Sequence, residues 1–141
     1  MSSVFSKIIA GELPGRFVYR DQSVVAFLTI EPLALGHTLV VPVQEVDKWT
    51  DLDPEVWARV NQVAQQVGQA IITAFGSRRA GLIIAGFDVP HTHIHVFPAN
   101  SMDDYNMAHV MQDVPEDAMD AAAAQIRQAL ADMGVAPDGA A

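Results

Sequence analysis

Three of the chain's five histidines stand at every second position of one short stretch. Residues 86–98 read Gly-Phe-Asp-Val-Pro-His-Thr-His-Ile-His-Val-Phe-Pro. Because successive side chains of a strand point to opposite faces, this spacing predicts a strand with the histidines on one face and mostly core residues on the other. The first face carries His91, His93, His95 and Phe97, and the second carries Thr92, Ile94 and Val96. We take the histidine face as the candidate site.

Three imidazoles side by side can attack, protonate or hold an anion near neutral pH. A single strand histidine is usually structural, but three in register would repel one another when charged and need partners when buried. A metal is the alternative, since imidazole is a common zinc ligand. Alternate strand residues lie roughly 6.6 Å apart, so the Cα atoms of His91 and His95 are about 13 Å apart. A straight strand therefore offers zinc two ligands, and two of these histidines with His37 could still form a three-histidine site.

The amino-acid composition argues against several classes of function. The chain has no cysteine, which excludes a disulfide framework, a thiol nucleophile and a thiolate metal site. A formal charge of −9 with only eight lysines and arginines argues against binding a nucleic-acid backbone, although a small anion can still be bound locally. The apolar runs are far shorter than a bilayer requires, and the N-terminus does not resemble a secretion signal. We therefore expect a cytoplasmic protein with no membrane segment.

The hydrophobic pattern predicts alternating strands and helices in one domain over residues 1–141. We expect a helical turn over 5–10, strands over 17–19, 24–28, 37–41, 81–86 and 91–97, a long helix between Asp53 and Gly76, and a last helix over about 115–133. Residues 99–114 show no clear period, and we expect the tail, 135–141, to be mobile. The two long helices carry apolar stripes that exceed what the sheet obviously needs, which favours a homodimer. The stripes are Val56, Val60, Val63, Val67, Ile71 and Phe75, then Met119, Ala122, Ala123, Ile126, Leu130 and Met133.

Three segments together resemble the histidine triad (HIT) family. His91-Thr92-His93-Ile94-His95-Val96-Phe97 is similar to the family's histidine signature. Residues 5–14, Phe-Ser-Lys-Ile-Ile-Ala-Gly-Glu-Leu-Pro, are similar to its opening, and residues 32–42, Pro-Leu-Ala-Leu-Gly-His-Thr-Leu-Val-Val-Pro, to its middle segment. The segments occur in the family's order and spacing and span residues 4 to about 98.

The resemblance implies an α+β fold, with a five-stranded antiparallel sheet, one long core helix and a C-terminal helix, usually paired as a dimer. It also implies hydrolysis or transfer of a nucleotide at the α-phosphate without a cofactor. Carried onto this chain, His93 is the nucleophile that forms a nucleotidyl-histidine intermediate. One ring nitrogen of His93 would donate to the backbone carbonyl of His91. The role of His91 itself would be mainly to position other groups. His95 and His37 would contact phosphate oxygens, as imidazolium or as neutral donors.

The same resemblance implies a pocket for a nucleotide, which we expect to be a purine nucleotide. Its lining would be Val4, Phe5, Phe27, Leu28, Thr29 and Ile30, with Phe87 and Asp88 next to the phosphate site. Thr29 replaces the family's usual ribose-binding aspartate and offers one hydroxyl to a vicinal diol. Phe87 and Asp88 replace the usual glutamine and serine or threonine, and an ionised Asp88 would repel a phosphate. Expected substrates are nucleoside phosphoramidates or dinucleoside polyphosphates.

Two other functions stay open at this stage. A nucleotide-binding or regulatory module with little turnover is suggested by Thr29, Phe87 and Asp88, and a zinc-dependent hydrolase comes third. Zinc-bearing relatives have two cysteines near the N-terminus and a histidine after the middle strand. The matching positions here are Ser3, Ser6 and Glu45, so we expect no metal, because hydroxyls are poor zinc ligands.

Overall fold

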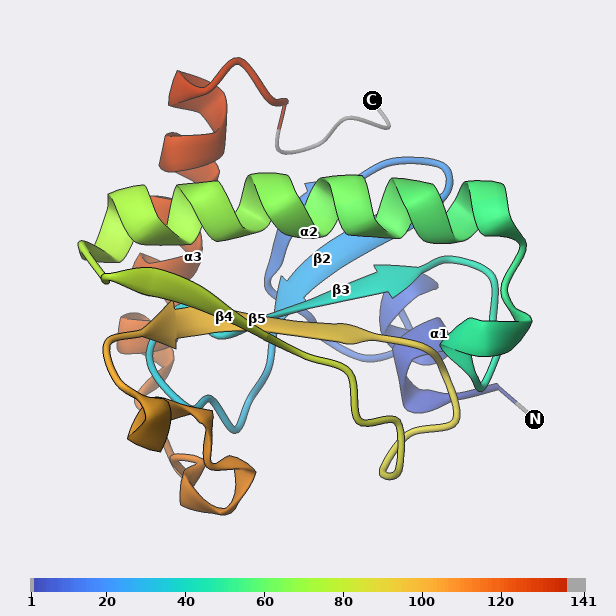
Figure 1. The fold of residues 1–141 in the computed structure, drawn as a ribbon, viewed down its shortest axis with the longest axis horizontal. Helices are drawn as coiled ribbons and strands as arrows, with labels where there is room; N and C mark the ends of the chain where they lie inside the picture. The colour runs from blue at the N-terminus through green and yellow to red at the C-terminus, as the bar shows by residue number, and fades with distance from the viewer. Residues whose placement is uncertain (1, 137–141) are drawn as a thin grey trace.

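The computed structural model describes residues 2–136 and contains one five-stranded sheet with three α-helices in that part of the chain (Figure 1). The strands are β1 (Phe17–Arg20), β2 (Val24–Leu28), β3 (Thr38–Pro42), β4 (Arg79–Ile83) and β5 (Ile94–Ala99). The helices are α1 (Val4–Ile9), α2 (Pro54–Phe75) and α3 (Glu116–Asp132), with 3-10 turns η1 (Trp49–Asp51), η2 (Met102–Tyr105) and η3 (Met107–His109). The strand order is β1-β2-β3-β5-β4, and every neighbouring pair is antiparallel. The α+β fold is confirmed.

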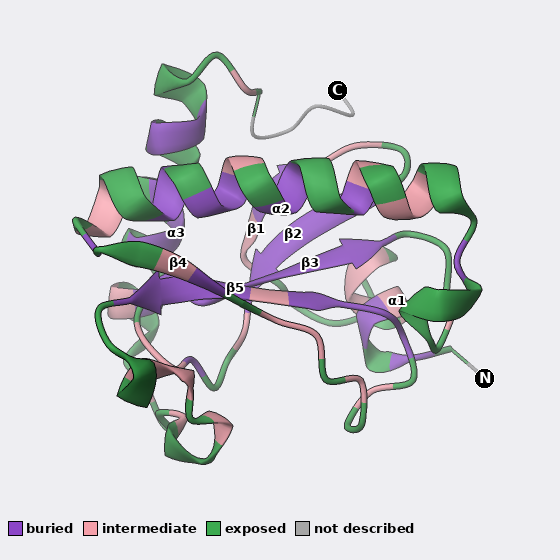
Figure 2. Cartoon of the chain, in the orientation of Figure 1, coloured by how far each residue is buried: buried purple, intermediate pink, exposed green. Residues whose placement is uncertain are grey.

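The long helix α2 begins and ends where the sequence predicts. The Asp53 carboxylate accepts a hydrogen bond from the backbone N–H of Glu55 at 2.9 Å, and Pro54 opens the first turn, where a missing N–H costs nothing. Gly76 ends the helix in the left-handed conformation, with φ of 65°. The buried residues of α2 face the sheet and its exposed residues face outward (Figure 2).

The main core fills the space between the sheet and the helices α2 and α3 (Figure 1). Val24, Ala26 and Leu28 of β2 point into it, as the two-residue period of a strand requires. Most of each predicted helix stripe is buried there, although Val56 and Phe75 are half-buried and Met133 is exposed. The chain thus covers the stripes of its own helices, which give no support for a dimer.

A second, smaller core lies on the opposite face of the sheet, where α1 packs. It contains Phe5 of α1 together with Val25, Phe27, Leu39 and Val41 of β2 and β3. Because the side chains of β2 alternate, Phe27 belongs to this core while its neighbour Leu28 belongs to the main one. The candidate histidines lie on this second face, since the ring of His93 is in contact with Phe5.

Several strand boundaries differ from the prediction, and three of them lie beside the candidate site. Strand β5 begins at Ile94 rather than residue 91, β4 ends at Ile83 rather than 86, and β3 begins at Thr38 rather than 37. The ladder between β3 and β5 stops at the pair Val40 and Ile94. Pro42 has no N–H with which to continue it, and the N–H of Thr92 donates instead to the carbonyl of Val46. His91 and His93 therefore precede the strand and do not form one straight row with His95.

The remaining segments complete the described chain. Residues 99–114 contain the short turns η2 and η3, in agreement with the lack of a helical or strand period in their sequence. Most of the tail that the sequence predicts to be mobile, residues 137–141, lies outside the described residues. Within residues 2–136, no helix combines the length and the apolar character that crossing a bilayer requires.

Candidate active site

The ring of His93 has a defined protonation pattern. Its Nδ1 lies 2.7 Å from the carbonyl oxygen of His91, and a carbonyl can only accept, so Nδ1 carries the proton. The Nε2 atom of the neutral ring then holds a lone pair, and within residues 2–136 it has no hydrogen-bond partner. The side chain is buried, with the Phe5 ring edge-on at 4.9 Å between centroids. Burial is the main cause that lowers the pKa of His93.

A chain of hydrogen bonds fixes the protons of His37 and His95. The backbone N–H of Leu33 donates to Nδ1 of His37 at 2.9 Å, so the proton of the neutral His37 ring is on Nε2. That Nε2–H donates to Nδ1 of His95 at 3.0 Å. The proton of His95 is consequently on its own Nε2, which can donate to a ligand. The rings of His93 and His95 lie 4.9 Å apart between centroids.

Burial keeps this pair of histidines neutral. It lowers the pKa of His37 to about 3, with a further lowering from the nearby His95. It also lowers the pKa of His95 to about 4, with His93 adding to the shift and the Asp88 carboxylate opposing it. Of the two forms left open by the sequence, imidazolium or neutral donor, the structure favours the neutral donor at pH 7.

His91 has both ring nitrogens occupied. Its Nε2 lies 2.8 Å from the carbonyl oxygen of Pro42, and its Nδ1 lies 2.7 Å from the hydroxyl oxygen of Ser3. The side chain is 0% exposed. A ring with neither nitrogen free is suited to holding other groups in place, and a mainly positional role for His91 stays a prediction.

Gly36 shapes the backbone that carries His37. Its φ is 101°, a conformation that L side chains rarely adopt, and an added Cβ would clash with the ring of Phe75. The Thr38 hydroxyl donates to the carbonyl of Gly36, and the N–H of His37 donates to the carbonyl of Ala34. This tight turn brings the ring of His37 to 5.2 Å from that of His95 between centroids.

Only part of the predicted nucleotide pocket comes together with the histidines. Phe5 contacts His93 directly, and Phe27 packs edge-on against Phe5. The side chain of Leu28 points into the main core on the other side of the sheet, so it does not line a pocket shared with Phe27. For Leu28 the prediction is corrected, because adjacent strand residues face opposite ways.

The remaining predicted contacts lie around the outside of this centre. The backbone N–H of Thr29 donates to the carbonyl of His37, and its hydroxyl accepts from the N–H of Glu31. Val4 is exposed on α1. Asp88 is exposed too, yet its charge acts on both His93 and His95. Phe87 is 97% exposed, so its ring makes almost no packing contact within the chain.

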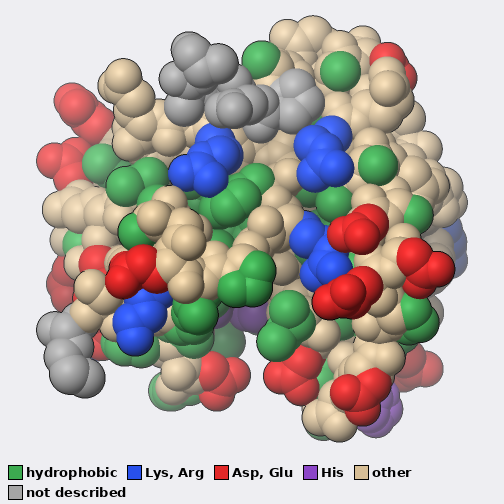
Figure 3. Space-filling model, turned by 180° about the vertical axis from the view of Figure 1, so that it is seen from behind, with side chains coloured by type: hydrophobic (Ala, Val, Ile, Leu, Met, Phe, Trp, Pro, Cys, Tyr) green, Lys and Arg blue, Asp and Glu red, His purple; other side chains and the backbone are tan. Residues whose placement is uncertain are grey.

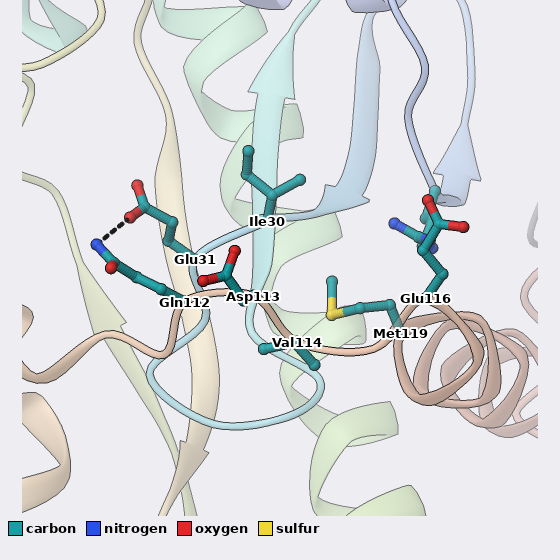
Figure 4. A pocket seen from close by; sticks show the side chains of 8 residues that line it. Ile30, Glu31, Gln112, Asp113, Val114, Glu116 and Met119 are labelled. Carbon is teal, nitrogen blue, oxygen red and sulfur yellow. Dashed lines mark hydrogen bonds between the residues drawn. The ribbon is translucent and has the colours of Figure 1, made fainter.

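A cavity of about 390 Å³ lies apart from the histidine centre, and none of the four clustered histidines lines it (Figure 4). Ile30 is the one predicted nucleotide contact that lines it. Its other walls include Glu31, Asp113 and Glu116, whose carboxylates oppose the binding of an anion. Lys and Arg side chains on the face shown in Figure 3 lie in separate groups among acidic and hydrophobic ones, in line with the acidic composition.

The residues 2–136 contain no cluster of three or more His, Asp or Glu side chains arranged to hold a metal ion. Ser3, Ser6 and Glu45 do come together, but through hydrogen bonds. The Glu45 carboxylate accepts from the backbone N–H of Ser3 and from the hydroxyl of Ser6, both at 2.7 Å. No pattern in the sequence indicates that Ser3 also bonds His91, or that the backbone groups of Leu33 and Pro42 bond the rings of His37 and His91.

We expect the protein to lose stability as pH falls below about 6.5. The folded-state pKa of His37 and of His95 is lowered, so between about pH 4 and 6.5 the unfolded chain binds more protons than the folded one. Each such histidine contributes about 1.4 kcal/mol per pH unit to the slope. Urea unfolding at a series of pH values between 5.0 and 7.5 measures the effect.

Two variants identify the histidines responsible for this slope. His37→Phe should flatten the slope below pH 6.5, whereas His109→Gln should keep it, because His109 is exposed and contacts none of the other four histidines. Equal slopes in the wild type and in His37→Phe would contradict the assignment.

Known proteins resemble this chain over most of its length. The model of the HIT domain matches residues 10–102. An uncharacterized HIT-like protein of Borreliella burgdorferi is 39% identical over 102 residues, covering 67% of this chain and 73% of its own. The crystal structure of a Zn-bound histidine triad family protein from Mycobacterium smegmatis superposes with a TM-score of 0.83 at 28% identity, over 95% of this chain and 96% of that one.

Two similar proteins carry the names of enzymes. Adenylylsulfatase HINT3 of Arabidopsis thaliana is 33% identical over 71% of this chain and 53% of its own length. An asymmetrical bis(5'-nucleosyl)-tetraphosphatase of Schizosaccharomyces pombe is 31% identical over 70% of this chain and 56% of its own length. This chain thus spans about half of either enzyme. Because the family model covers most of the sheet and all four clustered histidines, the chain belongs to the histidine triad (HIT) family.

Proposed function

We propose that this protein is a nucleotide hydrolase or nucleotidyl transferase that acts at the α-phosphate through a covalent intermediate on His93. The observation that carries the proposal is the bond from His93 Nδ1 to the carbonyl of His91, which leaves Nε2 as an unprotonated nucleophile. His93 is buried beside an aromatic ring and next to a neutral N–H donor, His95. No cofactor is required for this chemistry.

The reaction proceeds in two displacements at phosphorus. The Nε2 lone pair of His93 forms a bond to the α-phosphorus, and the bond to the leaving group breaks with its electron pair on that group, which takes a proton from solvent. The ring is then a cation, and the carbonyl of His91, which accepts Nδ1–H, stabilises that charge. Water next attacks the phosphorus, the electron pair of the N–P bond returns to Nε2, and the water's proton is released. The products are the nucleoside monophosphate and the protonated leaving group.

His95 and His37 support the transfer without changing charge. The Nε2–H of His95 donates to a phosphate oxygen, where negative charge develops in the transition state. His37 holds Nδ1 of His95 as an acceptor and so keeps the proton of His95 on the side of the ligand. A neutral pair also avoids the repulsion that two adjacent imidazolium rings would create.

The relatives support this general class of reaction. Both similar proteins with enzyme names, the adenylylsulfatase and the bis(5'-nucleosyl)-tetraphosphatase, are named for cleaving a nucleotide next to a phosphate. Their leaving groups differ, so the names support hydrolysis of a nucleotide but not one substrate. We keep a purine nucleotide as the expected ligand and a cytoplasmic location as predictions from the sequence.

Charge favours a substrate with an uncharged or cationic leaving group. Asp88 is exposed next to His93 and His95, and no lysine or arginine of residues 2–136 acts on the pKa of either ring. A polyphosphate leaving group would carry several negative charges toward this carboxylate. We therefore favour a nucleoside phosphoramidate over a dinucleoside polyphosphate.

A nucleotide-binding module with little turnover is the second candidate. Phe87 and Asp88 motivate it, because neither side chain replaces the polar phosphate contact that the family has before its histidines. The exposure of both residues is consistent with a loop that contributes little to phosphate binding. A zinc-dependent hydrolase has less support, since both ring nitrogens of His37 and both of His91 are already in hydrogen bonds within the protein.

We propose that the protein forms a homodimer through β4. This strand lies at an edge of the sheet, so its outer backbone groups have no strand partner among residues 2–136. Leu82 on β4 is 50% exposed, and Ile72 on the neighbouring helix α2 is exposed as well. Antiparallel pairing of two β4 strands across a two-fold axis would satisfy the backbone and cover both side chains.

We predict that His93→Ala abolishes turnover but keeps nucleotide binding. The change removes the attacking nitrogen and leaves the surrounding hydrophobic wall, so affinity should stay within about tenfold, roughly 1.4 kcal/mol. The assay is release of nucleoside monophosphate from a panel of nucleotide amidates and esters, with and without a chelator, beside calorimetric binding of the monophosphate.

His109→Ala is the matched control, because it removes an exposed histidine that contacts none of the four in the site. The wild type should also yield a nucleotidyl adduct on His93 when the reaction is quenched. Near wild-type turnover in His93→Ala would refute the mechanism. Loss of turnover in the presence of the chelator would favour the zinc-dependent hydrolase. A wild type that binds nucleotides but cleaves none would favour the nucleotide-binding module.

We predict that Asp88→Asn changes the preference for the leaving group. Removing the charge should raise kcat/KM for a dinucleoside polyphosphate about three- to tenfold relative to a phosphoramidate, at low ionic strength. Asp103→Asn, an exposed acid on η2 with the same change in net charge, should leave the ratio unchanged. The assignment fails if both variants shift the ratio equally, or if the Asp88 effect does not shrink in high salt.

We predict that the wild type sediments as a dimer of 30.4 kDa, twice the 15.2 kDa of one chain. Leu82→Lys should shift it toward the monomer at micromolar concentration, because two like charges would meet at the β4 interface. Leu13→Lys, an exposed apolar residue outside β4, is the control and should remain dimeric. A wild type that sediments near 15 kDa would refute the proposed homodimer.

A further inference from the structure

A group of polar residues that are far apart in the sequence meets around the ring of His91. The hydroxyl of Ser3, at the start of α1, lies 2.7 Å from Nδ1 of His91, although 88 residues separate the two. The backbone N–H of Ser3 donates to Glu45, and so does the hydroxyl of Ser6. Ser3 is itself buried. The contact therefore lies inside the molecule. If this hydrogen bond were lost, water could not replace it without a cost in free energy.

The direction of each bond in this group is determined. The carbonyl of Pro42 can only accept, so Nε2 of His91 is the protonated nitrogen and Nδ1 is an acceptor. The hydroxyl of Ser3 must then donate its proton to Nδ1. Its oxygen accepts in turn from the backbone N–H of Ser6, as the N-cap of α1. The Ser3 hydroxyl thus bonds the helix on one side and the histidine on the other.

We infer that Ser3 is a positioning residue for His93, acting through His91. The inference rests on the proposed function, in which Nε2 of His93 attacks phosphorus. His91 is held by Ser3 at one ring nitrogen and by Pro42 at the other, and the carbonyl of the same residue accepts Nδ1–H of His93. A ring fixed at both ends restrains the backbone to which it is attached, and with it the carbonyl that orients the nucleophile.

The helix α1 adds a second restraint from the same turn. Phe5, two residues after Ser3, lies edge-on to His93 at 4.9 Å and tilted to His91 at 5.9 Å between ring centroids. A shift of α1 would displace both the hydroxyl and the aromatic ring. The exposed carboxylate of Glu45, with two bonds to this turn, holds α1 against the segment that follows β3. The N-terminal helix therefore acts as a brace for the nucleophile.

Loss of the hydroxyl should affect the chemistry more than the binding. In Ser3→Ala the buried Nδ1 of His91 loses its donor, and an unsatisfied buried acceptor drives the ring to turn or the backbone to move. A small displacement of a nucleophile is costly, because attack requires alignment with the leaving group. The hydrophobic wall of the site, including Phe27, stays in place.

The experiment compares Ser3→Ala, Ser3→Thr and Ser6→Ala with the wild type, on the full chain. Steady-state kinetics should show kcat about tenfold lower in Ser3→Ala with KM within twofold, and kcat largely restored in Ser3→Thr, which keeps a hydroxyl. Ser6→Ala should keep kcat within twofold, because both bonds of Ser3, to His91 and to Glu45, remain. Urea unfolding corrects each rate for the folded fraction, since Ser3→Ala also removes an N-cap.

Two further measurements separate positioning from stability. In a His91→Asn background, Ser3→Ala should cost less than a further twofold in kcat, since the pathway through His91 is already broken. The ring 15N shifts of His93 should show the Nδ1–H tautomer in the wild type and in Ser3→Thr. In Ser3→Ala they should move toward the averaged values of two interconverting tautomers.

The role of Ser3 and the proposed function can be refuted by different results. The role of Ser3 is overturned if folded Ser3→Ala has wild-type kcat, if the loss is equally large in the His91→Asn background, or if the His93 shifts are unchanged. A wild type that cleaves no substrate would refute the proposed enzyme. The tautomer of His93 in Ser3→Ala would still decide whether Ser3 positions that ring.

Discussion

The hydrogen bond from His93 Nδ1 to the carbonyl oxygen of His91 is the interaction on which the rest of the site depends. An imidazole at neutral pH exchanges its proton between two nitrogens, and only one arrangement leaves Nε2 free to attack. A peptide carbonyl cannot be protonated in this range and cannot donate, so it selects that arrangement permanently. Leu33 and Pro42 act in the same way on His37 and His91, through a backbone N–H and a backbone carbonyl. The peptide chain, more than any side chain, sets the protons of this centre.

Burial and these backbone bonds act together on charge. Burial lowers the pKa of all four clustered histidines, which would otherwise titrate near pH 6.5 and repel one another when protonated. The result is a group of rings that bind through directed N–H donors and lone pairs rather than through net positive charge. Such a site is compatible with a chain whose formal charge is −9 and which has few cations to offer a phosphate. In such a site the charge of a single carboxylate, Asp88, acts on the pKa of both His93 and His95.

The elements with local signals were predictable from sequence, and those set by tertiary contacts were not. Asp53, Pro54 and Gly76 mark the ends of α2 because caps depend on residues within one turn. The five strands and their antiparallel arrangement also followed from alternation and from the resemblance to the family. The start of β5 could not be predicted, because it depends on Pro42 and Val46 of a distant segment. The resemblance to the family does not place the side chain of Leu28 correctly, because this residue faces the main core from β2.

The start of β5, which differs from the prediction, lies at the candidate site. Had residues 91–93 continued the ladder, the carbonyl of His91 would have been a partner for the neighbouring strand or would have pointed away from the ring two residues later. Because the ladder stops at Ile94, this carbonyl is free to accept from His93, and the ring of His91 can reach across to Pro42. A period of two in the sequence describes the spacing of the histidines but not the break in regular structure that orients them. The site therefore depends on two features: strand β5, which carries His95, and the irregular turn just before it, which decides which nitrogen of His93 carries the proton.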